Sequence, residues 1–323
     1  RDQLPKNWST QLFNALTFEH DKVFQKRNFY QCPLRQMCQD RKWTILNWLV
    51  ENRDVFQPRT IPRLIEIIIG DYNGRLWKMI SDQPPILALI KEIGSDKDKA
   101  IAKFRSFAEL LTNEELKTLC YGVIGHKEEF LTSKGESVLQ RAYDTTLLNC
   151  FISVKDRLPK IFFEDLYNVS IGRERYLSDL HIKAPKRLSS NCLLENAIAI
   201  DSIEFLDWMV DNSDLWPEDP EKAIISILQY EPGYETRTGL GRTPLQLAIS
   251  FQSVKVIQWW LDRSTLGQRE KISMVISILF GGENNEYIDR NGQRPIDVIL
   301  NKDRGYRDRE KRLVNLLDKY TSD

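Results

Sequence analysis

The sequence predicts an all-α fold: a helical repeat solenoid of about six units, each with about 51 residues and three helices. A recurring helix-start motif, a nearly fixed spacing and an apolar run after each motif predict this fold. Residues 241–248 read G-x-T-P-L-x-x-A, and residues 292–296 repeat that register 51 positions later. A fixed period of this kind indicates stacked supersecondary units.

The same register continues toward the N-terminus. Residues 197–208 overlay residues 248–259, and Gly135 opens another copy of the G-x-[ST]-x-L-x-x-A frame. The unit at Pro85 has the least sequence support, because it rests on spacing and one Pro-Ile-Leu-Ala string. The expected first helices begin at Pro33, Pro85, Val138, Leu193, Pro244 and Pro295, spaced 52, 53, 55, 51 and 51 residues apart.

These starts divide residues 1–323 into one elongated repeat domain. The expected units lie near 28–80, 81–132, 133–188, 189–238, 239–288 and 289–323. Residues 1–27 form a partial leading unit, because residues 4–8 echo residues 158–162. The chain therefore begins inside a unit. It is either a piece of a longer protein or an array without an N-terminal cap.

A third helix is expected in each unit after a polar or proline-rich break. Proline or acidic residues at the start of an apolar-periodic run are helix-start signals. The runs are residues 61–69, 114–119, 158–163, 220–228 and 269–276. The charged segment 96–105 is either a helix extension or an exposed loop.

The T-P-L-x-x-A frame resembles the ankyrin repeat, in which a similar stretch starts the first helix of a helix–turn–helix unit. Thr243 suits the helix cap, and Pro244 suits the first turn because its missing N–H would have no intrahelical partner there. A glycine before the cap permits the positive φ of a connecting hairpin. The resemblance implies a frame that binds partners with exposed side chains.

This chain departs from the ankyrin pattern at three places. The family histidine after leucine is Gln246 here and Asp297 in the last unit. The glycine between the first two helices is replaced by Gln252 or Asp201. The period is about 51 residues, against about 33 in the family.

Composition excludes several classes of protein. The 46 basic and 46 acidic residues balance, which argues against nucleic-acid binding. No run approaches the length of a membrane span, and the N-terminus lacks the apolar core of a signal peptide. Five cysteines without paired spacing indicate reduced thiols. The basic cluster in residues 290–312 is either a solvated terminal surface or a site for an anionic partner.

Catalytic, cofactor and metal motifs are not found, so we expect no cofactor, no metal site and no enzymatic activity. Gly239-Leu240-Gly241 is interpreted as hairpin glycines. Cys120 with His126 is either a thiolate–imidazole pair or a buried cysteine beside a loop histidine.

Tryptophans fall into two groups. Trp48, Trp208 and Trp259 occupy one repeat position, so we expect all three to be buried between second and third helices. Trp216 does not occupy this repeat position, and it is a candidate for an exposed contact.

The resemblance implies that hairpin tips and the open flank of the first helices bind a partner. Phe251 stands out there, because an aromatic at a mostly polar position suits an interface anchor unless a neighbouring unit covers it. Carried over by repeat position, the partner-binding candidates are Gln39, Asp40, Leu240, Arg242, Ser250, Phe251, Arg290, Asn291, Gln293, Asn301 and Lys302.

Two functions remain open from the sequence. The first is a protein-interaction scaffold. Long units rich in Lys, Asn and Gln resemble those of secreted effectors of intracellular bacteria, which implies a cytoplasmic protein, delivered into a host cell, that binds a host protein. The second is an enzyme whose catalytic part lies elsewhere or whose third helices build an unrecognised pocket. Neither the partner nor the oligomeric state follows from the sequence.

Overall fold

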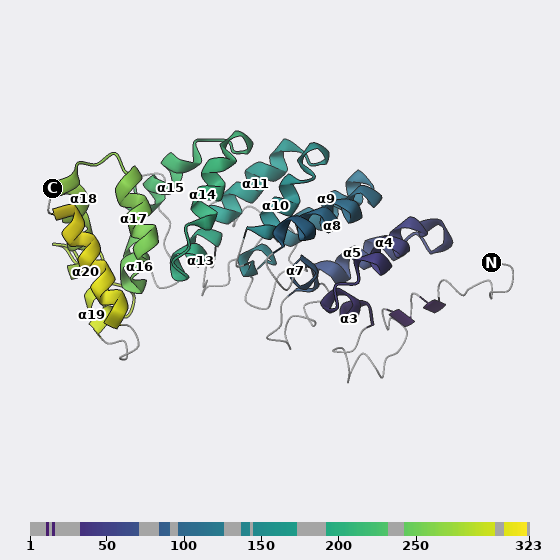
Figure 1. Cartoon of the computed structure of the whole chain (residues 1–323), viewed down its shortest axis with the longest axis horizontal. Helices are drawn as coiled ribbons and strands as arrows, with labels where there is room; N and C mark the ends of the chain where they lie inside the picture. The colour runs from purple at the N-terminus through teal and green to yellow at the C-terminus, as the bar shows by residue number, and fades with distance from the viewer. Residues whose placement is uncertain are drawn as a thin grey trace. The chain divides into compact units, whose positions relative to one another are not determined.

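The computed structural model describes residues 11–12, 15–16, 33–70, 84–90, 96–125, 137–142, 145–172, 192–231, 242–300 and 307–321. Within these ranges it contains sixteen α-helices and no strand (Figure 1). The all-α prediction is therefore confirmed. No described helix combines the length and the apolar character that a membrane span needs.

The chain divides into two compact units. The first comprises residues 1–162 with 180–183, and the second comprises residues 163–179 with 184–323. The expectation that residues 1–323 form one elongated array stays a prediction.

Helices of the first unit follow in triplets. They are α3 (Pro33–Gln39), α4 (Trp43–Glu51) and α5 (Thr60–Ile69), then α7 (Pro85–Ile90), α8 (Lys97–Leu110) and α9 (Asn113–Ile124). They are followed by the 3₁₀ turn η4 (Leu139–Arg141), α10 (Thr146–Ile152) and α11 (Lys160–Ile171), which spans the boundary between the units. The expected first helix at Val138 is thus a single 3₁₀ turn, and the charged segment 96–105 belongs to α8.

The second unit has the same order of helices. Its members are α13 (Leu193–Ala199), α14 (Glu204–Asp211) and α15 (Pro220–Gln229), then α16 (Pro244–Phe251), α17 (Val254–Arg263) and α18 (Gln268–Phe280), and finally α19 (Pro295–Leu300) and α20 (Arg307–Thr321). Helices cover four of the five runs in which we expected a third helix in full, and α11 begins at Lys160 within the remaining run, 158–163.

Corresponding helices of successive triplets lie against one another. In the first unit α3 contacts α7, α4 contacts α8 and α5 contacts α9. In the second unit α13 contacts α16, α16 contacts α19 and α17 contacts α20. The core therefore runs between triplets as well as within them.

The first helices begin with reciprocal caps. Thr243 Oγ1 accepts the N–H of Gln246 at 3.2 Å, and the Gln246 side chain accepts the N–H of Thr243 at 3.2 Å. Ser137 and Gln140 bond in the same way, at 3.3 and 2.7 Å. Each pair satisfies two helix-start donors that have no intrahelical acceptor. Gln246 thus has a structural role in the cap of α16.

Asp297 performs the same task in the last triplet. Its carboxylate accepts the N–H of Arg294 at 3.0 Å and two guanidinium bonds at 2.9 and 2.8 Å. The side-chain bonds from Arg294, followed by its backbone bond, lower the pKa of Asp297 to about 2. The carboxylate is thus charged across the physiological range.

Turns between first and second helices hold one residue in the left-handed region. Arg41, Asp201 and Gln252 have φ values of 57°, 54° and 55°. Glycine reaches this region without steric cost, but none of the three residues is a glycine. The backbone of this turn is therefore that of a glycine position, although the residues differ.

Three 3₁₀ turns precede third helices and share an aspartate. They are η2 (Arg53–Val55), η5 (Lys155–Arg157) and η6 (Ser213–Leu215). In η2 and η6 the asparagine at the N-cap donates its side-chain amide to the tryptophan carbonyl four residues earlier, each at 2.8 Å. This pair of contacts recurs 160 residues apart, so the local structure repeats together with the sequence.

The predicted burial of the three tryptophans is confirmed at two positions and wrong at the third, and their placement between second and third helices stays a prediction. Trp208 and Trp259 are buried, but Trp48 is 41% exposed. The rings of Trp48 and Phe56 meet edge to face with their centroids 6.0 Å apart. Trp208 instead packs against the larger ring of Trp216, with centroids 5.5 Å apart.

Trp216, which we expected to be exposed, is buried. The centroid of its ring lies 5.8 Å from that of Tyr167 on α11. Its indole N–H donates to the carbonyl of Met209 at 2.8 Å. It therefore occupies the place that Phe56 occupies beside Trp48.

Because Trp208 is buried and Trp48 is not, their truncation should differ. Trp208→Ala should lower the free energy of unfolding by about 3–5 kcal/mol, since it removes a large ring from a packed core. Trp48→Ala should cost clearly less. Urea unfolding of both variants measures the difference, and equal losses would contradict the burial described above.

Candidate functional site

The expected partner-binding edge is only partly open. Asp40, Arg290 and Asn291 are exposed, and Phe251 and Gln293 are half-buried. Asp40 accepts a bond from the Gln36 amide at 2.9 Å. Leu240, Asn301, Lys302 and the side chain of Gln39 lie outside the described part of the chain.

Arg242 is the main correction, because it lies in the core of the second unit. Its guanidinium donates to Asp289 Oδ2 at 2.6 Å, and the two side chains are 5% and 0% exposed. The residue was assigned to the open surface because it precedes the helix cap, yet the turn before α19 covers it. Arg242 therefore links two successive repeats and is not available to a partner.

Asp289 organises the turn that carries the exposed candidates. Its Oδ1 accepts the N–H of Asn291 at 2.8 Å and that of Gln293 at 3.0 Å. Gly292 completes the turn with φ 74°. Burial raises the pKa of Asp289, but the backbone bond from Gln293, the bond from Arg242 and the backbone bond from Asn291 outweigh it, so the pKa is lowered.

Ser250 is the second correction. It is buried, and its hydroxyl donates to the Gln246 carbonyl one helical turn earlier at 2.8 Å. Gln246 in turn donates its side-chain amide to the carbonyl of Tyr287 at 2.6 Å. Gln246 on this face of α16 therefore bonds to the turn before α19, and Ser250 does not lie on the surface.

Ile200 is an exposed apolar residue that the sequence reasoning missed. It directly follows α13, is 53% exposed, and lies 51 residues before Phe251. Since α13 contacts α16, the two side chains belong to corresponding places on neighbouring first helices. The spacing of 51 residues from Phe251 could have identified Ile200 as a surface candidate from the sequence. We call Ile200, Phe251, Arg290, Asn291 and Gln293 the first-helix edge.

Cys120 does not fit the nucleophile hypothesis. It is fully buried in α9, and this burial, with a smaller contribution from Cys150, raises the pKa of its thiol far above the usual range. A protonated thiol without solvent access is a poor nucleophile. His126, its suggested partner, lies outside the described residues. Within the described ranges, no three His, Cys, Asp or Glu residues gather in a group that could hold a metal ion.

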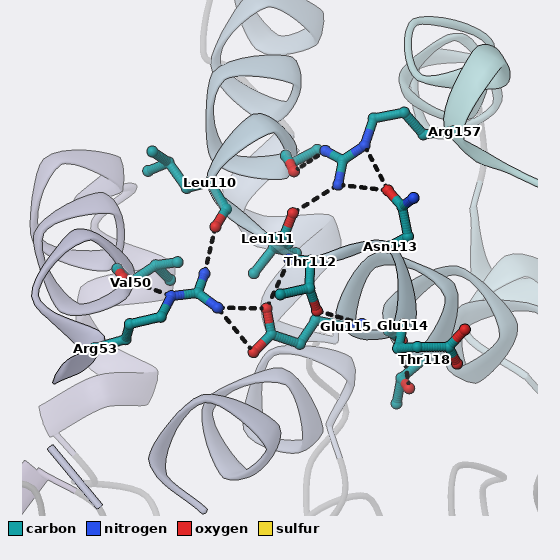
Figure 2. A network of polar contacts seen from close by, with 11 residues as sticks. Val50, Arg53, Leu110, Leu111, Thr112, Asn113, Glu114, Glu115, Thr118 and Arg157 are labelled. Atoms are coloured by element: carbon teal, nitrogen blue, oxygen red, sulfur yellow. Dashed lines mark hydrogen bonds and ion pairs between the residues drawn. The ribbon is translucent and has the colours of Figure 1, made fainter. Parts of the chain in front are cut away.

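A dense polar network surrounds the turn between α8 and α9 (Figure 2). Arg53 donates to both carboxylate oxygens of Glu115, at 3.2 and 3.0 Å, and to the carbonyls of Val50 and Leu110. Glu115 also accepts the N–H of Thr112 at 2.8 Å, so it caps α9 at the same time.

Arg157 reaches the same turn from η5 (Figure 2). It donates to the carbonyls of Ala108 and Leu111 at 2.5 and 2.6 Å and to Asn113 Oδ1 at 3.1 Å. The two arginines thus donate to carbonyls at the end of α8, where backbone acceptors run short of intrahelical donors. Of these carbonyls, that of Ala108 also accepts the N–H of Leu111 at 3.1 Å. Their donors are directed at protein groups. We therefore interpret the network as a structural one that connects η2, the turn between α8 and α9, and η5.

Comparison with known proteins gives no relative from which a function could be transferred. A scan of protein-family models gives no match, and neither the curated proteins nor the solved structures give one.

The ion pair between Arg242 and Asp289 predicts a specific pH dependence. A carboxylate whose pKa is lowered by folding contributes stability above its unfolded pKa of about 3.9, and that contribution is lost as the pH falls through the folded value. Asp289→Asn should cost about 3–5 kcal/mol at neutral pH, because it leaves Arg242 buried without its counter-charge. The free energy of unfolding of both proteins is measured from pH 7 down to pH 3. The difference between wild type and Asp289→Asn should become smaller below about pH 4. A difference that stays constant with pH would contradict the stabilising ion pair.

The hydrogen bonds of Arg157 predict that lysine at this position lowers the stability of the first unit. Arg157→Lys should destabilise the first unit by about 1–3 kcal/mol, since one ammonium cannot reach three separate acceptors in fork geometry. Arg105→Lys is the matched control, because Arg105 only pairs with Glu109 on an exposed helix surface. Amide hydrogen exchange of α8 and α9 should accelerate in Arg157→Lys alone, and equal protection in both variants would argue against the network.

Proposed function

We propose that this protein is a protein-interaction module built from ankyrin-like three-helix repeats. The partner is a protein that engages the first-helix edge of the second unit. One observation carries the proposal: Ile200 and Phe251, one repeat apart, keep apolar surface accessible on contacting helices. An aliphatic and an aromatic side chain on a fixed frame suit the centre of an interface.

Polar residues on the turn before α19 extend the proposed surface toward the N-terminal end of α16, because Gln246 in the first turn of α16 contacts this turn at Tyr287. Arg290 and Asn291 are exposed on the turn before α19, and their backbone is fixed by Asp289. A turn held by buried hydrogen bonds loses little entropy on binding, which favours affinity. The burial of Arg242 therefore supports the site indirectly, because it rigidifies the turn that presents Arg290.

The stacking of corresponding helices also supports the proposal. Repeat frames of this kind keep the backbone constant while exposed side chains change, and their concave surfaces bind other proteins. The resemblance of these long units to those of bacterial effectors makes a eukaryotic cell the natural source of the partner, which would then be a host protein.

The test compares three forms of the protein. Wild type, the double variant Ile200→Glu with Phe251→Ala, and the control Ile161→Glu are each used to capture proteins from a eukaryotic lysate. Ile161 is as exposed as Ile200 but lies on α11, so it controls for nonspecific apolar capture. A genuine partner is retained by wild type and the control and is lost by the double variant.

The captured protein is then purified and titrated by calorimetry. Removal of interface anchors should weaken binding by about 2–4 kcal/mol, while the melting transition stays close to that of wild type. The proposed site is abandoned if the double variant binds the purified partner as tightly as wild type does.

A further inference from the structure

Helix α18 leaves apolar side chains uncovered on one side. Its residues Val275 and Ile278 are buried, and the helix contacts α16, α19 and α20. Ile276 is 45% exposed, Phe280 is 56% exposed, and Ile272 is half-buried. Residues four apart lie above one another on a helix, so the last three side chains form one stripe. We call Ile272, Ile276 and Phe280 the α18 stripe.

A glycine at the C-terminal end gives several third helices a common register. Gly70, Gly172 and Gly281 directly follow α5, α11 and α18, with φ values of 110°, 74° and 99°. A left-handed glycine ends a helix at a defined place, so positions can be counted back from it. The residues at the places of the α18 stripe are Ile61, Ile65 and Ile69 in α5, and Phe163, Tyr167 and Ile171 in α11. All six of these side chains are buried, whereas the α18 stripe is not.

The neighbours of α5 indicate what covers these places. Helix α5 contacts α3 and α7, just as α18 contacts their counterparts α16 and α19. Helix α5 also contacts α9, the third helix of the following triplet. In the part of the chain that the structure describes, no third helix follows α20. The neighbour that α18 lacks is therefore the counterpart of α9.

Contacts of α11 and α15 place the same side of the helix against the following triplet. Tyr167, at the middle place of the stripe, packs against the ring of Trp216 and donates its hydroxyl to Glu218 Oε1 at 3.0 Å. Both partners lie directly before α15. At the last place in α15, Gln229 donates its side-chain amide to Ser264 Oγ at 2.8 Å, directly after α17. These places thus face the following triplet in each helix.

The second helix of the last triplet presents no such stripe. Among the described side chains of α20, Val314 is the exposed large apolar residue, and it lies among the exposed polar residues Lys311, Asn315 and Asp318. Scattered single apolar residues are normal on a surface, whereas a contiguous stripe marks an interaction site. A polar outer surface is typical of the end of a repeat array. The place of the second helix is therefore closed, and one further helix would cover the α18 stripe.

We propose that the α18 stripe binds a single amphipathic helix of a partner protein, which lies beside α18 as α9 lies beside α5. Its apolar residues would recur at intervals of three and four, as Leu116, Leu119 and Val123 do in α9. Charge does not select this helix, because exposed Arg269 and Glu270 lie side by side with opposite signs. Recognition rests on apolar complementarity, as it does where an amphipathic helix lies in an apolar groove.

This inference goes beyond the proposed function, because it concerns other residues. The first-helix edge includes Ile200 and Phe251, which follow or end first helices, whereas the α18 stripe lies on a third helix. Each surface can be altered without changing a residue of the other. Loss of one binding activity can therefore be distinguished from loss of the other.

The probe is a synthetic peptide of residues 112–125, which contains α9 with its N-terminal cap and its final glycine. Helices of this length are marginal in water, so a side-chain lactam between Glu114 and the lysine of Thr118→Lys keeps the peptide helical. Both positions are exposed in α9, and the lactam leaves its apolar side unchanged. The labelled peptide is titrated with the full chain under reducing conditions and followed by fluorescence anisotropy. We expect a Kd between about 10 μM and 1 mM, because one stripe buries a small area.

Variants of the full chain locate the binding surface. Ile276→Glu and Phe280→Glu should each weaken peptide binding by about tenfold or more, because each places a carboxylate against apolar side chains. Ile161→Glu, which changes a similarly exposed residue on α11, should bind the peptide as wild type does. The double variant Ile200→Glu with Phe251→Ala should also bind it as wild type does, which separates this test from that of the proposed function. Circular dichroism shows whether each variant is folded.

A control peptide and a measurement of mass distinguish the possible occupants. The peptide that carries Leu119→Glu and Val123→Glu should not bind, because its apolar side is interrupted. The proposal is overturned if wild type does not bind the unmodified probe at about 1 mM, or if Ile276→Glu and Phe280→Glu bind it as tightly as wild type does. Sedimentation velocity of the full chain over a concentration series tests self-association. An association that Ile276→Glu abolishes would assign the stripe to a second copy and would likewise overturn the proposal.

Discussion

Burial between corresponding helices of successive triplets is the constraint on which this structure depends. In α5, seven of ten residues are buried, because α3 and α7 cover one part of the helix and α9 covers another. A helix that is apolar around most of its circumference cannot be covered by its own triplet alone. Each of these triplets therefore depends on its neighbour for the burial of its apolar side chains.

Polar contacts between repeats follow from the same constraint. Once corresponding helices are packed, the ends of those helices are brought together and their unpaired backbone groups must be satisfied. Arg53 and Arg157 do this at the end of α8 by donating to the carbonyls of Leu110 and Leu111. Asp201 does it for α17 by accepting the N–H of Lys255 at 2.8 Å. Each contact joins residues about one repeat apart, so it reinforces the spacing that the apolar burial sets.

The sequence predicted the helices well because their signals are local. A proline at the first turn, a cap residue and an apolar period all lie within about 15 residues, and these define nearly every triplet. The left-handed backbone at Gln252 was not predicted, because no glycine marks that position in the sequence. Among the described residues, the unit near Val138 departs, because η4 replaces a full helix, and the last unit has two helices, α19 and α20, where three were expected.

Side-chain exposure could not be predicted in the same way. Arg242 looked like a surface residue because its buried counter-charge, Asp289, lies 47 positions away. Trp216 looked isolated because Tyr167, the ring that covers it, lies in the preceding repeat. In both cases the decisive neighbour belongs to another repeat, and a single-sequence pattern does not show which side chains of two repeats meet. The period gave the register of backbones, whereas burial depends on the particular residues that fill it.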